Sequence, residues 1–295
     1  MIYCVGETLY DIVFRNEKPE WALPGGGMFN CAMSLSHAGA DVQLITELGD
    51  DKIGNLIRKS LNSAGVKDDY LRISNNNSTL ALAFLDVKGN ADYQFYKAYP
   101  EKAPELTVPD FRKEDVLIFG SLYSVDHRNR GNIIKLAMAA KNTGTIIIYD
   151  PNFRKSHAAK LPDVLPLIKE NVSLADIVRG SDEDFSLISD AESSMAAYDF
   201  IQQVGCKNLI VTRNSQGVDL FAGETPLLHF DALPVKIVST IGAGDAFNAG
   251  FACQVHQFGR IPSSPEEWNI AISNGLSFAA EVCASRDNYI KPHTK

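Results

Sequence analysis

The segment IVSTIGAGDAFNAGF, residues 237–251, places two glycines and an aspartate between a β-branched run and an amphipathic stretch. The first-turn N–H groups of a helix have no intrahelical acceptor and carry the positive end of the helix dipole, so a glycine loop that opens a helix can hold an oxyanion or a phosphate. Asp245 would compete with that anion unless its carboxylate faces a substrate hydroxyl and accepts its proton, while the amides stabilise a transferred phosphoryl group. The alternative is that Asp245 only caps its own helix, which contributes about 0.3–1 kcal/mol.

A second glycine loop of the same kind lies near the N-terminus. Residues 23–40 read LPGGGMFNCAMSLSHAGA, so three glycines precede an apolar helical stripe that ends at Gly39. Glycines at such a place let the backbone approach a bound molecule closely and adopt positive φ. Asn30, one turn into the expected helix, can donate and accept hydrogen bonds in the same space. This second loop favours a ligand-binding role for Asp245 over a helix cap.

The spacing of the residues excludes two common nucleotide-binding motifs and a catalytic zinc site. A Walker loop requires GxxxxGK[ST], and neither Lys-Ser pair, at 59–60 and 155–156, follows a glycine. A Rossmann fingerprint needs a third Gly or Ala where Phe247 stands, and then a strand with an acidic end where this chain forms another helix. The six histidines form no HxxxH or HExxH pattern and there is no CxxC pattern, so we expect no protein-bound catalytic zinc.

The strands and helices that must position these loops can be predicted from the two periodicities of hydrophobic residues, one typical of strands and one typical of helices. Short β-branched runs alternate with longer segments of helical period, which predicts an α/β fold with parallel strands joined by crossover helices. The expected strands are 2–5, 42–46, 116–119, 145–149, 177–178 and 209–212, and a hairpin with AGE as its turn is expected over 217–230. The expected helices are 52–64, 132–140 and 196–204.

A hairpin over residues 79–97 interrupts this pattern. Two alternating hydrophobic runs are separated by KGN, and the second run carries Tyr93, Phe95 and Tyr96. We expect this hairpin to project from the sheet and, with residues 12–23, to form a small lid. The alternative is an antiparallel edge of the main sheet.

Composition limits the class of protein. With 295 residues, 45% of them hydrophobic and 22% charged, the chain can bury the core of one large α/β domain. The net charge of −8 argues against nucleic acid as a partner. No apolar run approaches the roughly 18 residues needed to cross a bilayer, and the N-terminus lacks a basic signal region, so we expect a cytoplasmic protein with no membrane partner. The five dispersed cysteines indicate reduced thiols rather than a disulfide framework.

The two glycine motifs together resemble the ribokinase-like (PfkB) family of carbohydrate kinases, and the resemblance covers essentially the whole chain. The early GE dipeptide with Asp11, followed by PGGGMFN, is similar to the N-terminal sugar-binding signature of that family. STIGAGDAFNAGF is similar to its C-terminal phosphate signature. The resemblance implies one domain over 1–295, with a doubly wound, mainly parallel sheet flanked by helices and a β lid from 12–23 and 79–100. It also implies an ATP-dependent kinase with a small-molecule sugar as substrate.

The resemblance assigns roles to individual positions. Asp245 would be the general base, and the amides of Gly242, Ala243 and Gly244 would form an anion hole. The residues expected to bind the sugar are Asp11, Gly26, Gly27, Asn30 and Phe95. The residues expected near ATP are Thr212, Arg213 and Gly217, by the phosphates and ribose, and Asn274, by the adenine. Alternative interpretations are a solvated loop carboxylate for Asp11, hairpin packing for Phe95, a surface charge for Arg213 and a polar helix-surface residue for Asn274.

Three positions bear on metal ions. The family places a glutamate after the strand that ends in ADIV, where it helps to organise the Mg²⁺ that arrives with ATP, and Glu183 is the candidate here. The alternative is that SDED only forms a helix N-cap with an acidic first turn. Gly180 stands where many members have asparagine, so that side chain's contribution is absent. Ser239 stands where the family often has an aspartate linked to a monovalent-cation site, so we do not expect potassium activation.

Three segments narrow the choice of substrate. YDPNFR, residues 149–154, is similar to a segment of fructokinases and 2-keto-3-deoxygluconate kinases. Its Arg154 can offer a planar donor fork either to the transferring phosphate or to a substrate carboxylate. FGSLYSV at 119–125 and YQFYK at 93–97 favour fructokinase, in which an aromatic lid covers an uncharged ketose. We therefore expect phosphorylation of the 6-hydroxyl of D-fructose; the alternatives are a 2-keto-3-deoxygluconate kinase, a nucleoside kinase, and an inactive sugar-binding protein.

The lid also bears on assembly. Lids in this family can be shared across a dimer, and an exposed face built from Tyr93, Phe95 and Tyr96 would favour burial by a partner. A homodimer through the lid is therefore favoured over a monomer.

Overall fold

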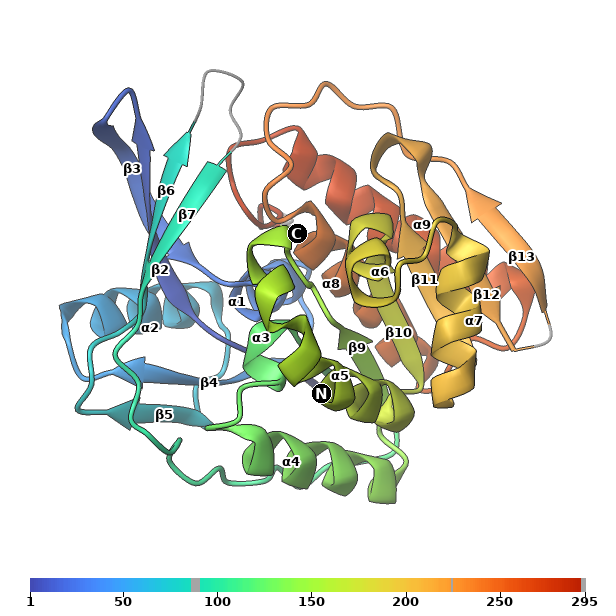
Figure 1. The fold of residues 1–295 in the computed structure, drawn as a ribbon, viewed down its shortest axis with the longest axis horizontal. Helices are drawn as coiled ribbons and strands as arrows, with labels where there is room; N and C mark the ends of the chain where they lie inside the picture. The colour runs from blue at the N-terminus through green and yellow to red at the C-terminus, as the bar shows by residue number, and fades with distance from the viewer. Residues whose placement is uncertain (86–90, 224, 293–295) are drawn as a thin grey trace.

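The computed structural model describes residues 1–85, 91–223 and 225–292. Within these residues a nine-stranded sheet forms the centre of the molecule (Figure 1). In spatial order its strands are β13 (Thr225–Phe230), β12 (Val218–Ala222), β11 (Asn208–Thr212), β10 (Ile177–Ser181), β9 (Ile146–Asp150), β8 (Val116–Gly120), β1 (Ile2–Val5), β4 (Val42–Gly49) and β5 (Leu71–Ser74). The strands from β11 to β5 pair in parallel, and β12 and β13 add an antiparallel hairpin at one edge. The mainly parallel α/β sheet is confirmed.

Both faces of the sheet are buried because successive strand residues alternate between two cores. In β1, Ile2 and Cys4 belong to one core, whereas Tyr3 and Val5 belong to the other. The first core is covered by α1 (Gly27–His37), α2 (Lys52–Ala64), α8 (Ala243–Phe258) and α9 (Pro265–Cys283). The second is covered by α3 (Ser121–Ser124), α4 (Arg130–Thr143), α5 (Leu161–Leu174), α6 (Asp182–Ser189) and α7 (Ser194–Val204) (Figure 1). Helices on both faces make the fold doubly wound, as predicted.

Local sequence signals account for most of these elements. α2 has the predicted bounds, since the Asp51 side chain accepts a hydrogen bond from the Gly54 amide at its start and Gly65 adopts a left-handed conformation at its end. The other predicted strands and helices are present, most of them extended beyond the predicted ends. The patterns missed β5, which is a short edge strand, and α5, which carries Pro166 in its interior.

A separate sheet of four strands projects from one end of the molecule (Figure 1). In spatial order it contains β3 (Lys18–Gly25), β2 (Leu9–Arg15), β6 (Leu80–Leu85) and β7 (Ala91–Tyr96). β2 with β3 and β6 with β7 form antiparallel hairpins, which are joined by a parallel pairing of β2 and β6. The segments 12–23 and 79–100 thus contribute to a small sheet of its own rather than to an edge of the main sheet. The predicted KGN turn, residues 88–90, lies outside the described residues, as does Glu224 of the predicted AGE turn.

The aromatic residues of β7 lie on opposite faces of the small sheet. Tyr93 and Phe95 share one face, and their stacked rings have centroids 5.8 Å apart. Tyr96 lies on the other face, together with Phe84 of β6, and both side chains are exposed. The surface predicted from Tyr93, Phe95 and Tyr96 is therefore divided between two faces rather than continuous.

The strand order places the predicted loops at one edge of the large sheet. β1 lies between β4 and β8, so the direction of winding reverses beside it. In open α/β sheets, ligands bind beyond the carboxyl ends of the strands at such a point. β3 of the small sheet leads directly into α1, so the small sheet borders the same crevice. In the described part of the chain, the helices are too short or too polar to cross a membrane.

Candidate active site

The two glycine loops meet, although they are far apart in the sequence. The Asn30 side-chain amide of α1 donates a hydrogen bond to Oδ2 of Asp245 in the first turn of α8, at 2.9 Å across 215 positions of sequence. A Cβ atom added to Gly27 would lie 3.0 Å from the other carboxylate oxygen of Asp245. The N-termini of α1 and α8 therefore face the same space, which confirms the predicted proximity of the two motifs.

Asp245 is placed to act on a ligand rather than on its own helix. Among the described residues its carboxylate has no hydrogen bond to the α8 backbone, so the helix-cap interpretation is not supported. The pKa of Asp245 is raised to about 6, because burial and the nearby Asp150 carboxylate raise it more than the Asn30 hydrogen bond and the charges of Arg154 and Arg179 lower it. A carboxyl with a pKa just below neutrality can accept a proton at physiological pH.

The backbone ahead of Asp245 has the conformation of a tight glycine turn at the helix start, and the predicted anion cradle would lie there. Gly242 has φ of +81°, and a Cβ there would overlap the backbone carbonyl of Asn288, so the loop requires glycine. Among the described residues, no acceptor is bonded to the amides of Gly242, Gly244 and Asp245. The Ala243 amide, in contrast, donates to the Thr240 carbonyl at 3.3 Å. The free donors at this helix end are therefore the two glycine amides and that of Asp245 itself.

A buried polar cluster that the sequence did not predict lies directly beneath this cradle. Arg179 of β10, 7% exposed, donates to Asp150 Oδ2 at 2.9 Å and to the Thr212 hydroxyl at 2.8 Å. The Asn248 side chain of α8 donates to the same Asp150 oxygen at 2.6 Å. A Cβ on Gly244 would lie 3.0 Å from the Arg179 guanidinium, so this cation lies against the first turn of α8. The cluster ties the ends of three strands to the cradle, and only the appearance of Asp150 and Asn248 inside the quoted motifs could have pointed to it.

Unpartnered polar atoms surround Asp245. The side-chain oxygens of Asn30 and Asn248 and Nε of Arg179 are buried without a hydrogen-bond partner in the described structure. Buried polar groups are normally satisfied, so these atoms can still accept or donate hydrogen bonds beside Asp245.

The predicted sugar-binding side lies between the small sheet and α1. The Asp11 carboxyl packs against Gly25, and burial raises its pKa to about 7. Burial raises the pKa of the Tyr93 phenol to about 12, with further contributions from the charges of Asp11 and Asp245 that are partly offset by Arg154. These electrostatic effects place Tyr93 and the exposed Arg154 beside the two carboxylates. Phe95 stacks on Tyr93, so it borders the same region, and Gly26 caps α1 there.

The residues predicted near a nucleotide lie at the end of β11, in the turn that follows it, and in the middle of α9. Thr212 is bonded to Arg179, and Arg213 forms an ion pair with Asp219 at 3.1 Å. Gly217, with φ of +88°, closes the turn between β11 and β12. Asn274 donates its side-chain N–H to the Gly250 carbonyl at 2.7 Å, which ties α9 to α8. One N–H of the Asn274 amide is thus used in helix packing, and its second N–H and its oxygen remain for a ligand.

The SDED segment forms the N-cap and acidic first turn of α6, as the alternative interpretation predicted. Ser181 caps the helix and forms a capping box with Asp184, which is buried and also accepts from the Phe153 amide at 2.5 Å. Glu183 is exposed and lines a cavity of about 710 Å³ together with Arg213. A Cβ on Gly180 would lie 2.8 Å from the Phe185 ring, so a larger residue does not fit there. The carboxylate nearest the Asp150 cluster is therefore Asp184, whereas the role of Glu183 stays a prediction.

Comparison with known proteins decides the family. A model described as "pfkB family carbohydrate kinase" matches residues 1–287. This chain belongs to the pfkB family of carbohydrate kinases. Family membership makes it a sugar kinase, and it implies the use of ATP as the phosphoryl donor.

Relatives of this pfkB kinase share both sequence and fold. It is 29% identical to fructokinase of Rhizobium leguminosarum bv. trifolii over 260 residues, 85% of this chain and 78% of the relative. It is 25% identical to aminoimidazole riboside kinase of Salmonella typhimurium over 253 residues, 84% of this chain and 79% of the relative.

Solved structures show the same architecture. The crystal structure of aminoimidazole riboside kinase from Salmonella enterica with aminoimidazole riboside and an ATP analog matches with a TM-score of 0.86 at 23% identity, covering 97% of this chain and 94% of that one. Fructokinase from Vibrio cholerae O395 with fructose, ADP and calcium matches with a TM-score of 0.85 at 17% identity, covering 97% and 94%. The ribokinase-like fold is confirmed.

The carboxylates of this pfkB kinase leave a limited role for a protein-bound metal. In the part of the chain that is described, no group of three or more His, Cys, Asp or Glu side chains could hold a metal ion. Both oxygens of Asp184 are occupied by protein donors, whereas Glu183 is exposed at the start of α6. A magnesium ion that arrives with ATP is held mainly by phosphate oxygens and water, and a single exposed carboxylate fits that arrangement.

Adding a methyl group to Gly27 is expected to disturb catalysis more than folding. In Gly27→Ala the new Cβ would lie 3.0 Å from Asp245 Oδ1 and 3.4 Å from the Asn152 side-chain nitrogen, so the carboxylate must move. Misplacement of a catalytic group by about 1 Å can cost roughly 10²-fold, and we expect a fall in kcat/KM of that order with little change in Tm. Gly131→Ala, where no atom lies within 4 Å of the new Cβ, is the matched control for steady-state assays. Equal kcat/KM in the two variants would contradict the close approach.

Proposed function

We propose that this chain transfers the γ-phosphate of ATP to the 6-hydroxyl of D-fructose. The observation that carries the proposal is the contact between Asn30 and Asp245, because it brings a carboxyl with a raised pKa, at a helix N-terminus with free amides, beside the first glycine loop. Several curated relatives are named fructokinase, at 24–29% identity, which supports a sugar substrate of this kind. The stacked Tyr93 and Phe95 rings on the small sheet provide an apolar cover for a neutral ketose.

In the proposed mechanism Asp245 accepts the proton of the sugar hydroxyl as the oxygen attacks the γ-phosphorus in line. Asn30 holds the carboxylate in position, and Asp11 binds other hydroxyls. The free backbone amides of Gly242 and Gly244 and the Arg154 guanidinium stabilise charge that spreads over the phosphoryl oxygens. Mg²⁺ bound with ATP would offset phosphate charge. Closure of the small sheet over the sugar would exclude water and limit hydrolysis of ATP.

A substrate panel tests the proposal. Purified protein with ATP and Mg²⁺ is assayed for ADP release with fructose, tagatose, ribose, 2-keto-3-deoxygluconate, adenosine and aminoimidazole riboside. We expect the highest kcat/KM with fructose. Turnover of the sugar acid alone would make the protein a 2-keto-3-deoxygluconate kinase, and turnover of the ribosides would align it with aminoimidazole riboside kinase, to which it is also similar. Thermal stabilisation by a sugar without ADP release would make it an inactive binding protein.

Several predictions from the sequence remain proposals. These are Glu183 as a residue that helps to organise Mg²⁺, the absence of potassium activation implied by Ser239, a cytoplasmic location and a homodimer through the lid. For the dimer, the relevant surface is the outer face of the small sheet, where Phe84 and Tyr96 are exposed. Phe14 stacks on Phe84 there, with centroids 4.9 Å apart, which makes that face apolar.

A further inference from the structure

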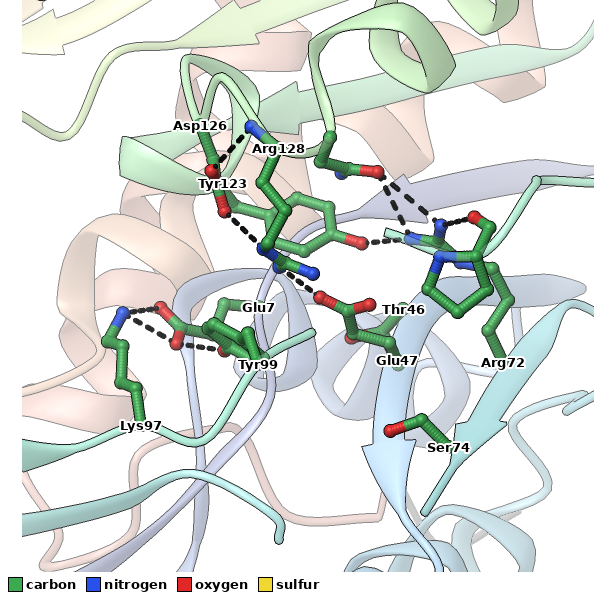
Figure 2. A network of polar contacts seen from close by, with 12 residues as sticks. Glu7, Thr46, Glu47, Arg72, Ser74, Lys97, Tyr99, Tyr123, Asp126 and Arg128 are labelled. Atoms are coloured by element: carbon green, nitrogen blue, oxygen red, sulfur yellow. Dashed lines mark hydrogen bonds and ion pairs between the residues drawn. The ribbon is translucent and has the colours of Figure 1, made fainter. Parts of the chain in front are cut away.

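A line of charged and aromatic side chains runs from the end of the small sheet into the large one (Figure 2). Lys97 Nζ lies 2.7 Å from Glu7 Oε1, and the Tyr99 hydroxyl donates to the same carboxylate. The Arg128 guanidinium stacks on the other side of the Tyr99 ring, with Cζ 4.0 Å from the centroid, and it forms a buried ion pair with Glu47 (Figure 2). The cations and carboxylates along this line are therefore matched.

The first pair of this line, Glu7 and Lys97, borders the proposed sugar cavity. Lys97 continues the face of β7 that carries Tyr93 and Phe95, and its Nζ lies 5.4 Å from the centre of the Phe95 ring. The backbone carbonyl of Glu7 packs against Gly26, so close that a Cβ at Gly26 would overlap it. The pair thus lies between the aromatic face of the small sheet and the first glycine loop.

His157 adds no positive charge beside this pair. Burial lowers the pKa of His157 to about 4, and the positive charges of Lys160, Lys97 and Arg154 add to that effect, so His157 is neutral. Arg154 is an exposed cation that acts electrostatically on Asp245, on Tyr93 and on His157.

The deeper cation, Arg128, is matched as well. It is paired with Asp126 at 3.0 Å in addition to Glu47. Lys97 and Arg128 therefore each have a carboxylate partner, whereas Arg72, further along the network in Figure 2, donates to Tyr123, Asn129 and the Pro104 carbonyl.

We infer that the Glu7–Lys97 ion pair determines the charge of the substrate and selects a neutral sugar over a sugar acid. The inference rests on the proposed function, since it concerns the acceptor site of that reaction. Hydroxyl groups can donate to the paired carboxylate and accept from the remaining N–H groups of Lys97, so a neutral polyol is satisfied without breaking the pair. A substrate carboxylate would either have to displace Glu7 from Lys97 or lie beside a second negative charge, and like charge is an effective way to reject a competitor.

Four proteins test the inference: the wild type, Glu7→Gln, Lys97→Gln and the double variant. The measured quantity is the ratio of kcat/KM for 2-keto-3-deoxygluconate to kcat/KM for fructose. Glu7→Gln leaves Lys97 unpaired and keeps an acceptor for Tyr99, so we expect the ratio to rise at least about tenfold, the change that 1.4 kcal/mol produces. Lys97→Gln leaves Glu7 unpaired, so the ratio should fall. The double variant is neutral again, so its ratio should return to that of the wild type.

The outcomes separate this inference from the proposed function. An unchanged ratio in both single variants, or a double variant that behaves like Glu7→Gln, would overturn the role of the pair while leaving the kinase activity in place. If wild-type protein phosphorylates neither substrate, the proposed function fails. The inference is then decided by calorimetry: the ratio of the Kd for fructose to the Kd for 2-keto-3-deoxygluconate should rise in Glu7→Gln, fall in Lys97→Gln and return to the wild-type value in the double variant. Should Glu7→Gln not fold, Lys97→Gln still decides it, because the Lys97 side chain is 35% exposed and its replacement buries no new polar group; an unchanged ratio there rejects the pair as the determinant.

Discussion

Asp245→Asn is expected to lower kcat by at least about 10²-fold while the KM for the sugar changes little. The replacement removes the proton acceptor but keeps the size of the side chain, and its carbonyl oxygen can still accept the hydrogen bond that Asn30 donates at 2.9 Å. Because the residue acts on the hydroxyl only as it attacks phosphorus, its loss should affect the transition state far more than sugar binding. ADP-release kinetics with calorimetry of sugar binding measure both quantities.

Asp11→Asn is the matched control, since it is the same substitution at a carboxyl proposed only to bind hydroxyls. There we expect KM to rise with a smaller change in kcat. Near-normal turnover of Asp245→Asn, or an equal loss of kcat in both variants, would reject Asp245 as the base.

The pH dependence of the wild-type enzyme should report the same group. The pKa of Asp245 is raised to about 6, mainly by burial, and the base works only when ionised. Activity should therefore be full above neutrality and fall as pH decreases through about 6, by up to tenfold per unit below it. A flat profile of kcat/KM between pH 5 and 8 would argue against a titrating base with this pKa.

Arg179→Gln is expected to impair both folding and catalysis, with a signature in the pH profile. Removal of one member of a buried ion pair costs about 3–5 kcal/mol, and here it leaves Asp150, 1% exposed, without its cation. Arg179 lowers the pKa of Asp245 and Asp150 raises it, so loss of the arginine should move the acidic limb to higher pH. A residue that only supported the fold would reduce the amount of active protein without shifting this limb. Chemical denaturation and kcat/KM measured against pH give the two quantities.

The double variant Asp150→Asn/Arg179→Gln separates charge from packing. It removes both charges at once, so we expect the acidic limb to return towards its wild-type position and part of the lost stability to be regained. If the acidic limb of the kcat/KM profile in the single variant Arg179→Gln lies at the same pH as in the wild type, Arg179 does not influence the base.

Several features of the molecule follow from local sequence alone. Alternating and helical hydrophobic patterns predicted the parallel strands and their helices, because residue spacing decides which face of an element is buried. Glycine at helix starts and ends, as at Gly65 and Gly242, marked the loops through backbone conformations that other residues rarely adopt. The two glycine motifs with Asp245 are therefore enough to predict a phosphate-binding site from the sequence.

The tertiary structure alone decided which side chains meet. Asn30 reaches Asp245, Arg179 pairs with Asp150, and Glu7 pairs with Lys97 across strands and helices distant in sequence, since such contacts depend on strand order and on how helices close over the sheet. A shift of one residue likewise separated the buried Asp184 from the exposed Glu183, which no charge pattern distinguishes. Local patterns reflect the burial of one face of an element at a time, whereas the assembled site depends on the simultaneous burial of many non-local contacts, and for that reason only the folded chain shows it.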